Sequence, residues 1–228
     1  KKVFAVIWTT TPWTIPSNMA ISMHPRFEYT FFDYKGDVYV IAQGLLASFL
    51  ADVAWEESDI KVIGSCTGQD LELLTTKHPL VDRKSPIILG EHVTLDAGTG
   101  SVHTAPGHGL EDYEVGCRYN IEVFSPLDSK GIWTEAVQDA DLVGIPYYKG
   151  NNIVIENIFI SGSCHVIVRF PATGTFKIHQ RQIGNSIHGY YRISLLAVVI
   201  EPIQKRGSIP AMYQHHSGNG LFDFFRNI

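Results

Sequence analysis

The side chains best suited to chemistry lie in a glycine-rich stretch at residues 96–113. It contains four glycines, a proline, the histidines His103 and His108, and the carboxylates Glu111 and Asp112. Such a density of glycine predicts an irregular loop whose main chain approaches something closely. The two carboxylates fall in the first turn of a following helix, where they can cap free N–H groups and the helix dipole favours negative charge. We therefore expect this loop to hold a cation or a substrate ammonium group, although a structural turn with two incidental histidines is the simpler explanation.

A second stretch places three hydroxyl groups at the end of an apolar segment. Residues 3–8 form a continuous apolar run rich in β-branched and aromatic residues, which predicts a buried strand, and Pro12 ends it because proline cannot donate to a strand ladder. The intervening residues are Thr9, Thr10 and Thr11. Threonine is common in strands for packing reasons alone, so these residues are either ordinary strand residues or the hydroxyl-lined wall of a pocket.

Together, the two stretches resemble the editing (CP1) domain that is inserted in isoleucyl-tRNA synthetases, members of the class I aminoacyl-tRNA synthetase family. The first signature is WTTTPWTIPSN at residues 8–18, and the second is GTGSVHTAPGHG at residues 98–109, followed by Asp112 and Tyr113. The related valyl and leucyl enzymes usually carry Arg where this chain has Thr11, and Glu or Asp in place of Trp13. The resemblance covers residues 1–160 and does not extend over residues 161–228. The His-x-Gly-His and Lys-Met-Ser-Lys-Ser elements of nucleotide activation do not occur in the sequence.

The resemblance implies hydrolytic editing of valine wrongly attached to isoleucine tRNA, with valyl-adenylate as a second substrate to consider. One methylene group discriminates between two amino acids by only about 1–3 kcal/mol, a value for which this enzyme is itself a standard example, so a second hydrolytic site is needed. The resemblance assigns Asp112 to the substrate ammonium and to catalysis, and His103 to the exclusion of isoleucine. The remaining site residues that it implies are the catalytic Thr9, Thr10, Thr11 and Asn18 and the substrate-binding Thr14. No Ser-His-Asp or Cys-His spacing singles out a nucleophile.

Composition places the chain among globular proteins. It has 228 residues, of which 45% are hydrophobic and 18% charged, and we expect residues 1–228 to form a single editing domain excised from a larger synthetase. The formal charge of −5 argues against an autonomous nucleic-acid binder. We therefore expect the rest of the synthetase to supply most phosphate contacts to the partner, the 3′ end of isoleucine tRNA carrying valine.

The spacing of the cysteines and the length of the apolar runs bear on the cellular compartment of the protein. The three cysteines are scattered without a CxxC pair, which indicates a reducing, cytoplasmic environment. The longest apolar run, residues 193–203, is too short to cross a bilayer, so no membrane association is expected. We expect no cofactor or metal in this domain, because ATP and Mg²⁺ serve the parent synthetase elsewhere.

The periodicity predicts an α+β, β-rich fold with a barrel-like core and peripheral helices. The expected strands are residues 3–8, 20–23, 29–34, 38–42, 60–63, 70–74, 87–89, 165–170 and 195–200. The expected helices are residues 43–56, 110–119 and 151–160. A structural role is expected for His78, and a solvated or core role for His188, His215 and His216.

Two other functions remain open from the residues alone. His103, His108 and Asp112 are acceptable metal ligands, so a metal-dependent hydrolase is one alternative. The other is a passive module that binds the acceptor end of tRNA without catalysis. Metal analysis of the purified protein tests the first, and deacylation of mischarged tRNA tests the second.

Overall fold

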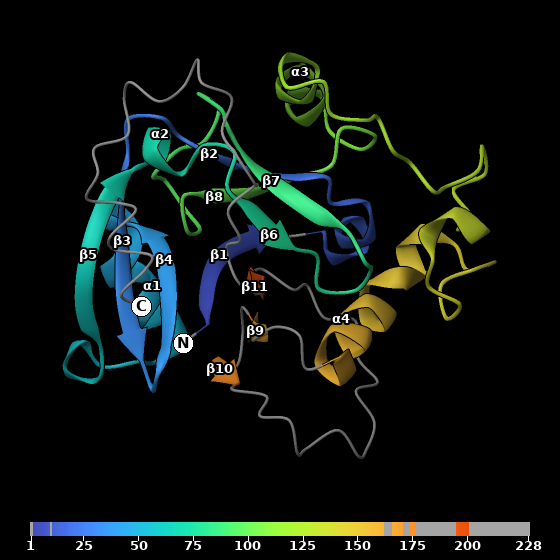
Figure 1. The fold of residues 1–228 in the computed structure, drawn as a ribbon. Helices are drawn as coiled ribbons and strands as arrows, with labels where there is room; N and C mark the ends of the chain where they lie inside the picture. The colour runs from blue at the N-terminus through green and yellow to red at the C-terminus, as the bar shows by residue number, and fades with distance from the viewer. Residues whose placement is uncertain (1, 10, 162–165, 171–173, 177–194, 201–228) are drawn as a thin grey trace.

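The computed structural model describes residues 2–9, 11–161, 166–170, 174–176 and 195–200. It shows a mixed, strongly curled sheet with a few helices at its periphery, as Figure 1 shows, which confirms the β-rich, barrel-like α+β class. The main path of the sheet runs in the order β10 (Gly174–Phe176), β9 (Val166–Phe170), β11 (Leu195–Ile200), β1 (Val3–Thr9), β8 (Ser101–Thr104), β2 (Ala20–Met23), β7 (Lys84–Leu89) and β6 (Thr75–Lys77).

A second branch of the sheet starts from the same central strand. Strand β4 (Asp37–Ala42) pairs with β1, β3 (Glu28–Tyr34) pairs with β4, and β5 (Lys61–Thr67) pairs with β3. The strands expected at residues 29–34 and 38–42 are present and form a hairpin: Tyr34 pairs with Asp37, and the two residues between them, Lys35 and Gly36, have φ of 55° and 96°. Positive φ at both positions is what a tight hairpin turn requires.

The helices are short and lie outside the sheet. They are α1 (Leu46–Val53), α2 (Gly68–Leu71), α3 (Leu110–Arg118) and α4 (Gly150–Ser161), with short 3₁₀ helices η1 (Pro12–Ser17), η2 (Gln43–Leu45), η3 (Glu57–Asp59), η4 (Glu135–Val137) and η5 (Tyr147–Lys149). Helix α1 covers the β3–β4 branch, where Phe49 packs against Phe32 with ring centroids 6.5 Å apart. None of the helices in the described part of the chain has both the length and the apolar character that a membrane crossing requires.

The two branches separate along one edge of β1, and Thr99 fills the point of separation. Residues 3–5 pair in parallel with β4, whereas Trp8 pairs in parallel with Val102 of β8. Between them, the Thr99 hydroxyl donates to the carbonyl of Val6 at 2.6 Å, and the Thr99 carbonyl accepts from the amide of Ala42 at 2.9 Å. The start of β8 is thereby fixed against β1 and β4.

Gly100 makes this close approach possible. Its φ is +73°, and a Cβ on it would lie 2.3 Å from the Cβ of Ala42, so no other residue fits without a shift. The buried phenol of Tyr29 donates to the Gly100 carbonyl at 2.6 Å. Desolvation by burial raises the pKa of Tyr29 well above its ordinary value, so the phenol stays a donor.

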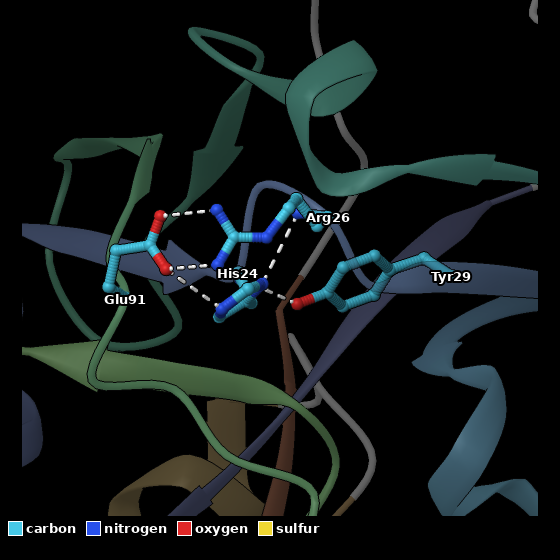
Figure 2. A network of polar contacts seen from close by, with 4 residues as sticks. All are labelled: His24, Arg26, Tyr29 and Glu91. Atoms are coloured by element: carbon cyan, nitrogen blue, oxygen red, sulfur yellow. Dashed lines mark hydrogen bonds and ion pairs between the residues drawn. The ribbon is translucent and has the colours of Figure 1, made fainter.

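A polar network holds Tyr29 from the other side, as Figure 2 shows. The amide of His24 donates to the Tyr29 oxygen at 2.9 Å, and the amide of Arg26 donates to His24 Nδ1 at 3.2 Å. The Arg26 guanidinium donates to both oxygens of Glu91, at 3.2 and 2.8 Å, and His24 Nε2 lies 3.2 Å from the same carboxylate. The turn before β8 is therefore connected through Tyr29 to the end of β2.

Three predicted elements differ from the structure. Residues 70–74 are not a strand, because Thr67 and Asp70 form a reciprocal capping box that begins α2. The helix expected at residues 43–56 begins with η2 and ends at Val53, where Ala54 adopts a φ of 52°. The stretch expected to be an irregular loop contains β8, which pairs with β2 along its whole length. The strands expected at residues 165–170 and 195–200 and the helices at residues 110–119 and 151–160 are present, with ends shifted by up to one residue.

Candidate functional site

The threonine segment turns sharply at the end of β1. The Thr11 amide donates to Thr9 Oγ1 at 3.1 Å, and the two hydroxyl oxygens are 3.3 Å apart. Pro12 then opens η1, in which Thr14 Oγ1 lies 3.3 Å from Thr11 Oγ1 and 2.8 Å from the Thr11 carbonyl. Three of the four predicted threonines therefore form one chain of hydroxyls. Thr10 lies outside the described residues.

The hydroxyl chain continues into the second signature through His103. Strand β8 places His103 opposite Ile21 of β2, and its Nε2 lies 2.7 Å from Thr14 Oγ1. On the other side of the ring, Nδ1 lies 2.9 Å from Asn18 Oδ1. The Asn18 amide nitrogen donates to Ser85 Oγ of β7 at 2.8 Å. Two segments far apart in the sequence thus meet in one buried polar network.

The partners of His103 define its protonation. Asn18 Oδ1 can only accept, so Nδ1 carries the proton. The Thr14 hydroxyl has a single proton, for which the Thr11 carbonyl at 2.8 Å and His103 Nε2 at 2.7 Å compete. Desolvation by burial, followed by repulsion from His78 and His108, lowers the pKa of His103 to about 3. His103 is therefore a neutral, fixed ring at neutral pH, and neither nitrogen is free to take up a proton from a substrate.

Two side chains from the β6–β7 hairpin hold η1 in place. The ring of His78, which is only 1% exposed, contacts the Ile15 carbonyl through Nε2 at 2.8 Å, and its Nδ1 accepts from the amides of Leu80 and Val81. Burial lowers the pKa of His78 to about 4, and the structural role predicted for it is confirmed. Arg83 Nη1 donates to the carbonyls of Pro16 and Asn18, both at 3.1 Å.

Asp112 is half-buried at the start of α3 and does not cap that helix, contrary to expectation. The N-cap residue is Gly109, which has no side-chain cap, and Asp112 Oδ2 instead accepts from the amide of Ala105 at 2.9 Å. No hydrogen bond from the described residues engages its Oδ1. Burial raises the pKa of Asp112. The hydrogen bond from the Ala105 amide and, to a smaller extent, the nearby His92 partly offset this rise. The carboxylate is thus fixed by one oxygen and has the other available.

His108 joins the two signatures a second time. Its Nε2 lies 2.9 Å from Ser17 Oγ, and its ring contacts the edge of Trp13 with centroids 5.2 Å apart. Burial lowers the pKa of His108. Glu111, by contrast, is exposed.

The geometry does not support the metal-hydrolase alternative. Both ring nitrogens of His103 are within hydrogen-bonding distance of protein groups, and Nε2 of His108 contacts Ser17. Across the described residues, no group of three or more His, Cys, Asp or Glu side chains has the arrangement of a metal site.

Ser85 and Arg83 are parts of the site that the sequence analysis did not identify. Ser85 is fully buried within the apolar strand β7, and a polar residue in such a strand is the one signal that could have drawn attention to it. Arg83 and Asn18 are 65 positions apart in the sequence, so no local pattern connects them.

The chain is similar to known proteins over this same region. No family model matches it. It is 46% identical over 158 residues to the isoleucine–tRNA ligase of Staphylococcus carnosus (strain TM300), which covers 69% of this chain and 17% of the relative. It is 50% identical over 153 residues to that of Lawsonia intracellularis (strain PHE/MN1-00), which covers 67% of this chain and 16% of the relative. The chain thus spans about a sixth of the length of the curated relatives it matches.

Solved structures share the fold at low sequence identity. The leucyl-tRNA synthetase domain GlLeuRS-CP1 has a TM-score of 0.53 at 16% identity, covering 70% of this chain and 82% of that chain. The P. falciparum cytosolic leucyl-tRNA synthetase editing domain has a TM-score of 0.52 at 13% identity, covering 69% and 77%. The chain is therefore a homologue of the isoleucyl-tRNA synthetases over the matched region and belongs to the CP1 editing-domain fold.

Proposed function

We propose that this chain hydrolyses the ester bond between valine and the 3′ end of isoleucine tRNA, as the editing module of an isoleucyl-tRNA synthetase. The observation that carries the proposal is the continuous network Thr9–Thr11–Thr14–His103–Asn18, which joins the two signature segments through the distances given above. Homology to isoleucine–tRNA ligases and the fold of synthetase editing domains support it. We further propose that the module acts in the cytoplasm, with the rest of the synthetase as its partner and with no cofactor or metal of its own.

In this proposal, Asp112 binds the α-ammonium group of the substrate. Its Oδ2 is held by the Ala105 amide at 2.9 Å, so Oδ1 can form a charge-assisted hydrogen bond without reorganisation of the side chain. Because the carboxylate is half-buried, such a bond orients the substrate as well as adding affinity.

The hydroxyls of Thr9 and Thr11 position the ester and the attacking water. The oxygen of the water forms a bond to the ester carbonyl carbon, the bond from that carbon to the ribose oxygen breaks, and one proton of the water passes to the ribose oxygen, which leaves as the hydroxyl. The ester is already activated, so holding water and ester in reacting geometry supplies much of the rate. His103 does not act as the base, because burial lowers its pKa to about 3 and its Nε2 lies against the Thr14 hydroxyl at 2.7 Å.

His103 instead forms the wall that excludes isoleucine. Burial of one additional methylene is favourable by only about 0.8 kcal/mol, so a permissive pocket would accept isoleucine at least as well as valine. Exclusion therefore requires a side chain that cannot move, since overpacking is what penalises the larger substrate. Hydrogen bonds to Thr14 and Asn18 on opposite sides of the ring hold His103 in this way.

Deacylation of matched charged tRNAs tests the proposal. The unmodified protein should hydrolyse valine-charged isoleucine tRNA and leave isoleucine-charged tRNA intact, whereas a passive binding module would hydrolyse neither. His103→Ala should permit hydrolysis of the isoleucine ester, with a smaller loss of valine hydrolysis. His103→Gln, which retains bulk and hydrogen-bonding groups, is the matched control and should remain more selective. If both rates fall together and their ratio is unchanged, His103 is not the wall.

A further inference from the structure

Two exposed tyrosines extend outward from the threonine turn. Tyr147 and Tyr148 form the start of η5 and are 41% and 64% exposed. The ring of Tyr147 lies 4.8 Å from that of Trp13, which in turn contacts His108. The ring of Tyr148 continues the series, 5.8 Å from Tyr147 and nearly perpendicular to it at 87°. Because Trp13 lies between Thr11 and Thr14, this series of rings begins at the site itself.

The backbone holds the tyrosine pair in a fixed position. The amide of Tyr147 donates to the Gly131 carbonyl at 2.9 Å, and the amide of Lys149 donates to the Pro146 carbonyl at 2.9 Å. Gly131 has a φ of +73°, and a Cβ on it would lie 3.0 Å from Tyr147 Cδ1, so the loop is shaped around the tyrosine ring. Rigid aromatic rings lose little conformational entropy when a ligand stacks on them.

We propose that Tyr147 and Tyr148 stack with the unpaired bases that precede the terminal adenosine of the bound tRNA 3′ end. This inference rests on the proposed function, because a substrate ester on the terminal ribose requires the preceding single strand to leave the site along its rim. Aromatic rings next to a basic group are the usual platform for single-stranded nucleic acid, and the exposed Lys149 follows the pair directly. The net charge of −5 argues against a binding mode that rests on phosphate attraction alone, which favours stacking as a source of affinity.

The experiment compares two substrates that differ only in these bases. Valine-charged isoleucine tRNA carries them, whereas 3′-O-valyl-adenosine does not. Tyr148→Ala should raise KM for the charged tRNA about 5- to 140-fold, the range that loss of one stacked base gives, with kcat within about twofold. The same variant should hydrolyse valyl-adenosine like the unmodified protein, and Tyr148→Phe should keep the original KM for both substrates.

Val62→Ala is the matched control, because Val62 is 56% exposed on β5 in the other branch of the sheet. Equal effects of Tyr148→Ala on both substrates, or no effect on either, would overturn the inference. An effect on thermal stability with no change in either KM would instead indicate a contact with another protein segment.

A binding measurement separates this inference from the proposed function. If the unmodified protein hydrolyses neither substrate, the proposed function fails. Fluorescence anisotropy of a labelled single-stranded oligonucleotide ending in CCA then tests the stacking alone. The unmodified protein and Tyr148→Phe should bind it, and Tyr148→Ala should bind it at least 5-fold more weakly, the lower end of the range above. Equal binding by all three proteins would refute the stacking role.

Discussion

Acidification should destabilise this domain through two histidines that are buried in the neutral form. His103 and His78 have pKa values lowered by desolvation to about 3 and about 4 from an ordinary 6.5. In the unfolded chain both take up a proton as the pH falls below 6.5, whereas in the folded chain both stay neutral. The stability that they support is therefore fully present above pH 6.5, and it is lost progressively between pH 6.5 and the folded pKa values.

The magnitude follows from the linkage between proton binding and folding. At pH 4.5 the solution is two pH units below the pKa of each histidine in the unfolded chain, whereas each folded histidine remains mostly neutral. Protonation of the unfolded chain therefore lowers the free energy of unfolding by about 2.5 kcal/mol for each histidine, relative to pH 7. The two together approach about 5 kcal/mol, a large fraction of the 5–15 kcal/mol by which domains are ordinarily stable. Asp112 acts in the opposite sense, because burial raises its pKa and the folded state takes up a proton more readily.

Urea unfolding at pH 7.0 and pH 4.5 measures this loss. His103→Gln and His78→Gln remove one titrating ring each, so each variant should lose about 2.5 kcal/mol less on acidification than the unmodified protein, whatever its stability at pH 7. Gln is the better replacement for this stability measurement, because Ala would also leave Asn18 Oδ1 or the Ile15 carbonyl without its partner and so lower the stability at both pH values. If His103→Gln loses as much stability as the unmodified protein, the folded His103 takes up a proton as readily as the unfolded one, and burial does not lower its pKa.

Two further predictions concern the substrate contacts. Asp112→Asn should retain the hydrogen bond from Ala105 and fold normally. Its kcat/KM should nevertheless fall at least about 10-fold, since a charge-assisted hydrogen bond contributes about 1.5–3 kcal/mol. An unchanged rate of valine deacylation in a folded variant would exclude the ammonium contact. Thr11→Ser should deacylate the charged tRNA nearly as fast as the unmodified protein, and Thr11→Val more slowly. Val keeps the shape of Thr but lacks the hydroxyl, whose oxygen lies 3.3 Å from the hydroxyl oxygens of both Thr9 and Thr14. Equal rates for the Ser and Val variants would show that only packing matters at this position.

Local signals predicted most of the elements near the site. The strand before Pro12 and the tight turn at Lys35 and Gly36 follow from backbone restrictions that act within a few residues. The strand β8 was missed because its flanking glycines dominate the local pattern. Its strand conformation comes from pairing with β2, a contact between residues about 80 positions apart in the sequence, which composition does not encode.

The composition of the site was predictable only in part, for a related reason. The two signatures identified Thr9, Thr11 and His103, but the groups that fix their orientation come from β7 and the hairpin before it. The Asn18 contact with Ser85 and the Ile15 contact with His78 span 67 and 63 positions. Such contacts depend on the order of strands in the sheet, which a single sequence leaves open.

The pairing of β1 with β11 has a consequence for how the protein is made. Thr9 lies opposite Leu196 in that antiparallel pair, and Ala5 lies opposite Ile200. During synthesis, the strand that leads into the threonine turn emerges nearly two hundred residues before its neighbour on that edge. Until then one edge of β1 has free backbone donors and acceptors, which is the kind of surface that pairs with other chains. Assembly of the site is thereby tied to the synthesis of β11, and release of a chain cut short before β11 would leave the threonine strand as an aggregation hazard.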